Sequence, residues 1–91
     1  MSIQWLFDVI ENRKHNPVER SYTSSLFAAG LPKIAQKVGE EGTEVVVAAL
    51  AQDDERLIAE VADLTYHTLV LLSARGLTPA HVAAELEKRH Q

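Results

Sequence analysis

The stretch KVGEEGTEVVVAAL, residues 37–50, places three glutamates directly beside a run of valine, alanine and leucine. On a helix that turns about 100° per residue, Glu40, Glu41 and Glu44 fall within one arc, and apolar positions flank that arc. We therefore expect a long amphipathic helix whose carboxylates lie at the edge of the core rather than on its solvated face.

A second stretch, ERLIAEVADLTYHTLVLL, residues 55–72, has apolar residues around nearly its whole helical circumference, which predicts a buried helix. Glu60 and Asp63 share one face of it, and His67 continues that face. Gln52-Asp53-Asp54 predicts a tight turn with an aspartate N-cap between the two long helices. The helices should therefore be antiparallel neighbours that aim both acidic groups at one spot.

The remaining sequence shows helical spacing and capping residues but no strand alternation, so we predict an all-α fold. The expected segments are a first helix that Asn16-Pro17 ends, a short helix over LFAA that Gly30 closes, a long helix from Leu31 to about Ala51, a second long helix to about Arg75, and a last helix, AHVAAELEKRH, capped by Thr78-Pro79. We expect one domain, residues 1–91, built as a bundle of about four to five helices.

Composition excludes several classes of protein. The formal net charge of −4 provides no general basic field, so we expect no nucleic-acid partner. The absence of cysteine excludes cysteine-ligated metals and disulfides. Apolar runs are broken well before the roughly 18 residues of a membrane span, and the N-terminus lacks the pattern of a secretory signal. We expect a soluble, cytoplasmic protein with no membrane partner.

The short chain and the all-round apolar second helix also predict a homodimer. With 91 residues, the chain is near the lower size at which a domain buries enough apolar surface to fold alone. Antiparallel helices from two subunits should complete the bundle, with the acidic sites near the interface.

The acidic residues need compensating charge, because burying an ionised carboxylate without a partner is costly. Lys33 and Lys37 project into the acidic arc but supply only two charges, and Arg56 begins the second long helix away from that arc. A hard divalent cation, Mg²⁺ or Mn²⁺ rather than Zn²⁺, suits a set of carboxylates without cysteine. This pattern suggests metal-assisted hydrolysis or transfer at phosphorus, with a solvated face or a salt-bridge network as the alternative.

The spacing of these acids resembles a known signature. EExxE, from Glu40 to Glu44, is followed sixteen residues later by ExxD, Glu60 to Asp63, as in the all-α, MazG-like nucleotide pyrophosphohydrolases. More specifically, the chain resembles the phosphoribosyl-ATP pyrophosphohydrolase family of histidine biosynthesis. The matching segments are ENRK, SYTSSLFAAGLPKIAQKVGEEGTE, ERLIAEVADLTYHTLVLL and ARGLTPAHVAAELEKR, which cover nearly the whole chain.

The resemblance implies Mg²⁺-dependent cleavage of phosphoribosyl-ATP between its α and β phosphates, giving phosphoribosyl-AMP and pyrophosphate. It implies that the metal ligands are Glu41, Glu44, Glu60 and Asp63. Glu40 would be a further ligand or would orient the attacking water. Lys33 and Lys37 would stabilise phosphate charge.

Each of the other matched residues has two possible roles, one functional and one structural. Ser21, Tyr22 and Thr23 form the SYT element and would contact substrate, or they cap a helix. Arg13, with Lys14, would reach a phosphate, or it simply complements the end of the first helix. His67 would hydrogen-bond a ligand carboxylate, or it is a satisfied core histidine.

Two further functions compete with this interpretation. A MazG-like, house-cleaning nucleoside triphosphate pyrophosphatase would share the metal site and differ around SYT. A non-catalytic helical interaction module would use the carboxylates only as salt-bridge partners. Without cysteine, the chain also lacks the ligands of the cyclohydrolase domain often fused to this family, so we expect the stand-alone form.

Overall fold

The first two helices begin at serine caps, as seen in a computed structural model that describes residues 1–90. Ser2 Oγ accepts a hydrogen bond from the Trp5 amide at the start of α1 (Ile3–His15). Ser21 Oγ accepts one from the Ser24 amide at the start of α2 (Tyr22–Ala29). Gly30, with a φ of 97°, ends α2 in a backbone region that favours glycine.

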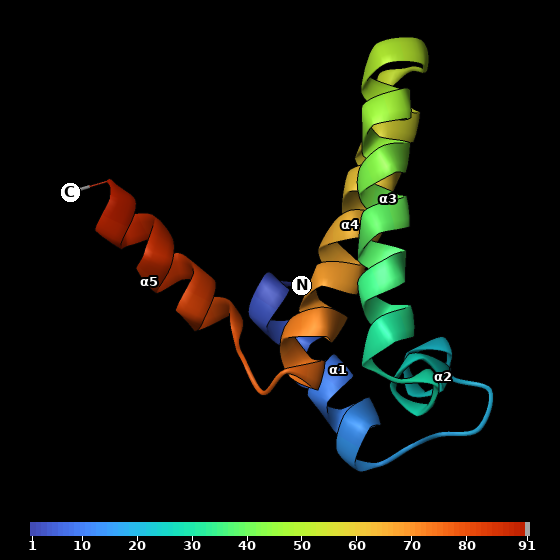
Figure 1. Ribbon diagram of the computed structural model, residues 1–91, viewed down its shortest axis with the longest axis vertical. Helices are drawn as coiled ribbons and strands as arrows, with labels where there is room; N and C mark the ends of the chain where they lie inside the picture. The colour runs from blue at the N-terminus through green and yellow to red at the C-terminus, as the bar shows by residue number, and fades with distance from the viewer. Residues whose placement is uncertain (91) are drawn as a thin grey trace.

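The next two helices form a long antiparallel hairpin. Helix α3 (Leu31–Ala51) starts immediately after Gly30, and a short turn leads into α4 (Asp54–Ala74). The Asp53 carboxylate caps α4 by accepting a hydrogen bond of 2.9 Å from the Arg56 amide. Figure 1 shows α3 and α4 side by side as the tall part of the molecule.

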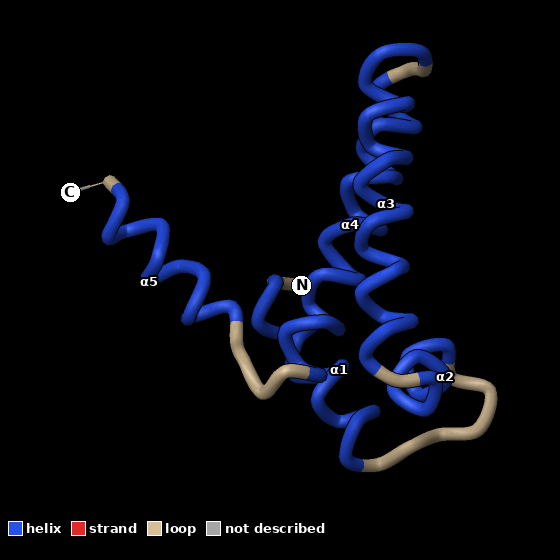
Figure 2. Tube along the Cα trace, in the orientation of Figure 1, coloured by secondary structure: helices blue, strands red, loops and turns tan. Residues whose placement is uncertain are grey.

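The last helix leaves the hairpin at an angle. Gly76, with a φ of 71°, turns the chain after α4, and Thr78 with Pro79 starts α5 (Pro79–Arg89). Within residues 1–90 every regular element is a helix, as the tube in Figure 2 shows, so the predicted all-α class is confirmed. The helix ends fall within a few residues of the expected positions, and the expected domain limit, Gln91, lies outside the described residues.

The core lies at the base of the hairpin, where α1 and α2 pack against α3 and α4. Its buried apolar side chains are Phe7, Ile10, Leu26, Ile34, Leu69 and Val70. Helices α1 and α4 are also joined by polar contacts. Ser73 Oγ donates a 2.7 Å hydrogen bond to Glu11, and Lys14 Nζ contacts both Glu11 and the Ser73 carbonyl oxygen at 2.8 Å.

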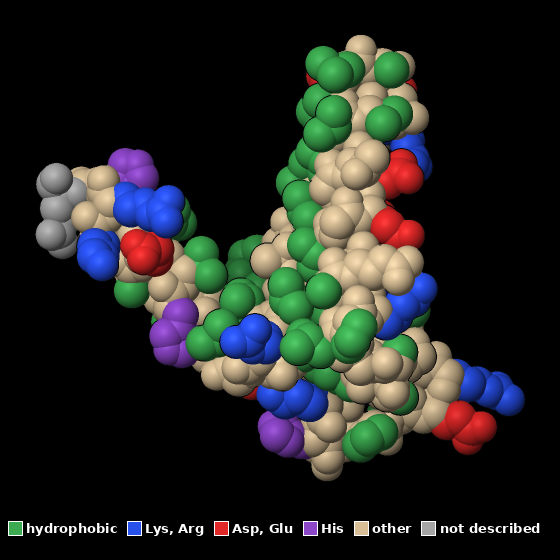
Figure 3. Space-filling model, in the orientation of Figure 1, with side chains coloured by type: hydrophobic (Ala, Val, Ile, Leu, Met, Phe, Trp, Pro, Cys, Tyr) green, Lys and Arg blue, Asp and Glu red, His purple; other side chains and the backbone are tan. Residues whose placement is uncertain are grey.

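The expectation that α4 is buried on all sides is wrong for the single chain. Its side chains are buried mainly toward the C-terminal end, whereas Ile58 is 70% exposed and Val61 is 43% exposed. The reason is geometric, because α1 and α2 are short and pack only near the base. Figure 3 shows apolar side chains along one edge of the hairpin and charged ones along the other.

By length and composition alone, α4 qualifies as a membrane span within the described part of the chain. The core helices of soluble proteins meet the same criterion, and α4 carries Glu60 and Asp63 near its middle. The helix therefore gives no more than weak evidence for a membrane.

Candidate metal centre

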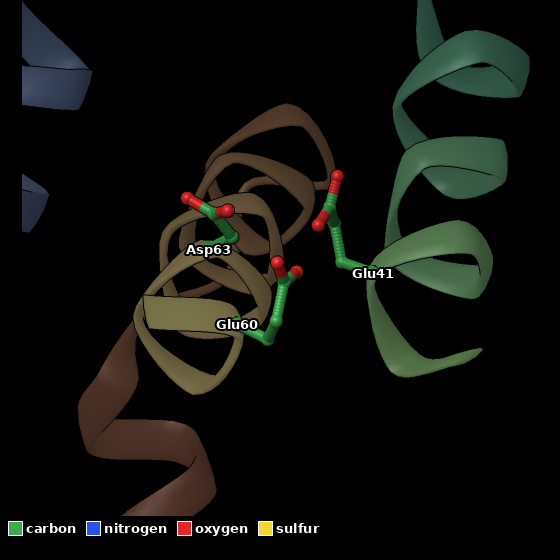
Figure 4. Close-up of side chains that lie close together, drawn as sticks. All are labelled: Glu41, Glu60 and Asp63. Atoms are coloured by element: carbon green, nitrogen blue, oxygen red, sulfur yellow. The ribbon is translucent and has the colours of Figure 1, made fainter. Parts of the chain in front are cut away.

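Three carboxylates meet where α3 faces α4. Glu41, Glu60 and Asp63 each offer one oxygen, and these oxygens all lie within 4.8 Å of one another. Glu60 and Asp63 share a face of α4 because they are three residues apart, and Glu41 reaches across from α3 (Figure 4). We call Glu41, Glu60 and Asp63 the carboxylate trio.

The members of the trio differ in burial. Glu60 is 5% exposed, Glu41 is partly buried and Asp63 is exposed. The trio therefore runs from the helix interface outward to solvent. A carboxylate as buried as that of Glu60 needs a countercharge or hydrogen-bond donors.

Lys37 supplies positive charge from the α2 side. Its Nζ lies 3.5 Å from a Glu41 oxygen and 3.8 Å from a Glu40 oxygen. Partial burial would lower the pKa of Lys37, but the electrostatic influence of Tyr22, Glu41 and Glu40 and a hydrogen bond with Glu41 outweigh it and leave that pKa raised. Lys37 is therefore a fixed cation at neutral pH.

Arg56 supplies positive charge from the other side of the trio. Its guanidinium forms an ion pair with Glu60, a contact we did not predict because we considered Arg56 only in relation to the arc of Glu40, Glu41 and Glu44. The helical wheel of 37–50 does not contain Arg56, so that arc alone could not reveal the contact. The spacing of Arg56 and Glu60, at i and i+4 on one helix, is the signal that predicts it.

His67 links the trio to α2. The Asp63 carbonyl oxygen only accepts, so Nδ1 of His67 carries the proton of their 2.7 Å hydrogen bond. In the neutral ring, Nε2 then accepts from the Tyr22 hydroxyl at 2.9 Å. His67 is thus a satisfied core residue that contacts the backbone of Asp63 rather than its carboxylate.

The SYT element lies beside this contact. Ser21 caps α2, and the Thr23 hydroxyl hydrogen-bonds the Tyr66 hydroxyl. The rings of Tyr22 and Tyr66 stack with centroids 6.1 Å apart, and His67 meets both edge-on. Burial raises the pKa of the Tyr66 hydroxyl despite the opposing hydrogen bond with Thr23. Tyr22, Tyr66 and His67 form an aromatic cluster at the α2 end of the trio.

The other predicted residues lie at varying distances from the trio. Glu40 and Glu44 are exposed and line an open depression of about 370 Å³ together with Lys37, Glu41 and Thr43. Lys33 is exposed near the start of α3. Arg13 donates to the Asn12 side chain, and Lys14 is held at the end of α4 by Glu11 and Ser73. The structure therefore groups Glu41, Glu60 and Asp63 with Lys37, but it leaves Glu44, Lys33 and Arg13 outside that group.

The donor set fits a hard divalent cation. The trio offers only carboxylate oxygens, the ligands that Mg²⁺ and Mn²⁺ prefer, and the chain contains no cysteine to favour a softer metal. The gradient of burial also fits, because a cation that keeps several waters needs a site open to solvent on one side.

Comparison with known proteins supplies independent information. A family model described as phosphoribosyl-ATP pyrophosphohydrolase matches residues 4–90. The phosphoribosyl-ATP pyrophosphatase of Lacticaseibacillus casei (strain BL23) is 57% identical over 97% of this chain and 80% of its own length. That of Pyrobaculum calidifontis is 51% identical over 96% of this chain and 93% of its own length. The histidine biosynthesis bifunctional protein HisIE of Xanthomonas axonopodis pv. citri is 53% identical, over 91% of this chain and 40% of its own length.

Proposed function

The chain belongs to the phosphoribosyl-ATP pyrophosphohydrolase family, and from this premise we propose that it hydrolyses phosphoribosyl-ATP to phosphoribosyl-AMP and pyrophosphate with Mg²⁺. This reaction is the histidine-biosynthetic step for which its relatives are named. The observation that carries the metal assignment is the meeting of three carboxylate oxygens within 4.8 Å across two helices.

The trio would hold the cation, with Mn²⁺ as a possible substitute for Mg²⁺. Glu41, Glu60 and Asp63 provide the oxygens that already converge. Glu44 is the proposed fourth ligand, because it lies at i+3 from Glu41 and therefore on the same side of α3. Glu40, exposed beside the same depression, would bind the metal or orient the attacking water.

The protein's own residues would hold the substrate around this site. Lys37 would stabilise negative charge that develops on the phosphates, since it is already fixed as a cation beside Glu41. Lys33 and Arg13 are further phosphate-binding candidates, and Ser21, Tyr22 and Thr23 would contact the nucleoside at the α2 end. A bound divalent cation supplies charge neutralisation of the phosphates and acidification of water.

The reaction needs no covalent intermediate. Water adds at the α or the β phosphorus, the anhydride bond between them breaks, and its electron pair leaves with the group that was not attacked, which is pyrophosphate for attack at α and phosphoribosyl-AMP for attack at β. The proton released from water passes to solvent or to a neighbouring carboxylate, for which Glu40 is the candidate.

The substrate assignment has a direct test. Pyrophosphate release from phosphoribosyl-ATP, measured with Mg²⁺, should exceed release from each of the common deoxynucleoside triphosphates under the same conditions. A preference for deoxynucleoside triphosphates would overturn the assignment and favour the house-cleaning alternative.

We also propose that two copies assemble into a cytoplasmic homodimer. The upper part of the hairpin exposes apolar side chains, namely Val46, Val47, Leu50, Ile58 and Val61. A groove of about 430 Å³ lined mainly by apolar side chains of α1, α4 and α5 adds to this unpartnered surface. A second hairpin packed on these surfaces would form a four-helix bundle and place both metal sites near the interface.

A further inference from the structure

The two cations beside the trio have the same spacing to their carboxylate partners. Lys37 precedes Glu41 by four residues on α3, and Arg56 precedes Glu60 by four residues on α4. Because α3 and α4 run antiparallel, these cations lie at opposite ends of the trio. Lys37 lies toward α2 and the aromatic cluster, whereas Arg56 lies toward the turn at Gln52 and Asp53.

The Arg56 pair is asymmetric in burial. The Glu60 side chain is 6% exposed, whereas the Arg56 side chain is 57% exposed. Glu60 cannot turn to solvent without leaving the helix interface, but the guanidinium can swing away through water. When another cation competes for Glu60, Arg56 is therefore the partner that moves.

We propose that Arg56 neutralises Glu60 only while no divalent cation is bound, and that the displaced guanidinium then binds the pyrophosphate half of the substrate. This inference rests on the proposed metal site. Arg56, which pairs with Glu60 in the metal-free protein, would thus bind phosphate at the turn end of the site.

The exchange has a chemical basis. A bound divalent cation takes over the charge of Glu60, so the guanidinium loses its main reason to remain there. Guanidinium groups present parallel donors that match phosphate oxygens, and they keep their charge at any physiological pH. Arg56 is therefore suited to bind the phosphates of a substrate that arrives together with the metal.

The distribution of aromatic side chains indicates which way the substrate lies along the trio. The α2 end of the trio offers the rings of Tyr22, Tyr66 and His67, which suit the nucleoside. Between residues 45 and 62, around the turn end, the sequence contains no aromatic residue. The nucleoside therefore lies toward α2 and the terminal phosphates lie toward Arg56.

Three variants test the exchange. Arg56→Ala removes the guanidinium, and Arg56→Lys keeps the charge without the paired donors. Arg89→Ala is the matched control, because Arg89 forms an exposed i, i+4 pair with Glu85 on α5, far along the chain from the trio. Two measurements are made on each: the Tm with and without saturating Mg²⁺, and the calorimetric affinity of the Mg²⁺-loaded protein for pyrophosphate.

The exchange predicts that Arg56→Ala lowers the metal-free Tm by about 5 °C and that Mg²⁺ removes this deficit, since the metal replaces the lost charge. Arg56→Lys should restore the metal-free Tm. Both variants should bind pyrophosphate more weakly, Arg56→Ala by about tenfold or more. Arg89→Ala should match the wild type in pyrophosphate affinity and in its Tm response to Mg²⁺.

A Tm deficit that persists in Mg²⁺, or an unchanged affinity for pyrophosphate in Arg56→Ala, would overturn the exchange while the metal site stands. If the wild-type protein itself shows no response to Mg²⁺ or Mn²⁺, the metal site fails and the exchange fails with it. The wild-type titration thus separates the two claims.

Discussion

Glu60 and Asp63 lie within one turn of α4, yet their surroundings differ. Glu60 is buried and paired with Arg56, whereas Asp63 is exposed and, within residues 1–90, forms no side-chain ion pair. Removing the charge of Glu60 therefore changes a buried ion pair, but removing that of Asp63 changes little in the metal-free fold. Asp63 is accordingly the better position for separating catalysis from stability.

At Asp63, we expect Asp63→Asn to abolish nearly all turnover while leaving the metal-free Tm within about 2 °C of the wild type. The activity loss should exceed the roughly 10–100-fold that loss of an outer partner of a metal ligand costs, because the amide is a weaker metal ligand. Steady-state pyrophosphate release and thermal denaturation check the two halves. Asp8→Asn, at an exposed position on α1, is the control. Near-normal turnover in Asp63→Asn would remove Asp63 from the site.

At this scale the sequence predicted the convergence of acidic residues but not their neighbours. Glu41, Glu60 and Asp63 could be grouped because helical spacing and a short turn fix which faces meet. The Arg56 pair was missed because Arg56 was considered only in relation to the acidic arc of residues 37–50, although it lies four residues before Glu60 on α4. The exposure of Glu44 depends on how α3 is rotated against α4, which spacing does not determine.

The joint between α1 and α4, where Glu11 contacts Lys14 and Ser73, depends on the charge of Glu11. Burial would raise the pKa of Glu11, but hydrogen bonds from Lys14 and Ser73 and the positive charges of Lys14 and His15 lower it overall. A carboxylate with a lowered pKa in the folded state stabilises the fold at pH values above its unfolded pKa, about 4.3, and loses that contribution as the pH falls through the folded value.

Glu11→Gln should therefore destabilise the protein at pH 7 by about 1 kcal/mol or less, since Glu11 is partly exposed and screened. The difference from the wild type should shrink as the pH is lowered from 5 toward 3, in about the range set by the unfolded pKa. Urea denaturation at several pH values measures this. A difference that stays constant over that range would show that the charge of Glu11 does not stabilise the joint.

Helix α3 contains Gly42, and a Cβ added there would meet nothing within 4 Å in the single chain. Gly42→Ala should raise the free energy of unfolding by about 1 kcal/mol, and the Tm by about 4–8 °C, because alanine has the higher helix propensity. Thermal denaturation gives the answer. A lower Tm would mean that a surface from outside the chain packs against Gly42.

The helix ends themselves were predictable from short-range chemistry. Asp53 and Ser21 cap helices where their side chains reach free amides, and Gly30 and Gly76 take backbone angles that favour glycine. The angle at which α5 leaves α4 was not predictable, because it depends on the turn at 75–78 and on packing across the whole chain.

For the molecule as a whole, many large apolar side chains lie outside the core and remain exposed to solvent. Ile58 and Leu50 are largely exposed near the turn of the hairpin, and the core lies at the opposite end. Apolar periodicity shows that a face needs a partner, but it does not say whether that partner comes from the same chain. This is why the burial of α4 was overestimated.

We expect Ile58→Lys to shift the protein from dimer to monomer, because a charged side chain would enter the proposed apolar interface. Sedimentation velocity at micromolar concentration measures the shift. Gln52→Lys, at the exposed turn, adds the same charge and should remain dimeric. A wild-type protein that sediments as a monomer, or an Ile58→Lys variant that stays dimeric, would contradict this interface.

The proposal that carboxylates from α3 and α4 jointly hold a divalent cation underlies the function proposed for this protein. Its most direct test is a crystal structure of the protein grown with Mn²⁺ and recorded at a wavelength where manganese scatters anomalously. We expect an anomalous peak within bonding distance of Glu41, Glu60 and Asp63. A structure of active protein at saturating Mn²⁺ with no peak between these side chains would contradict it.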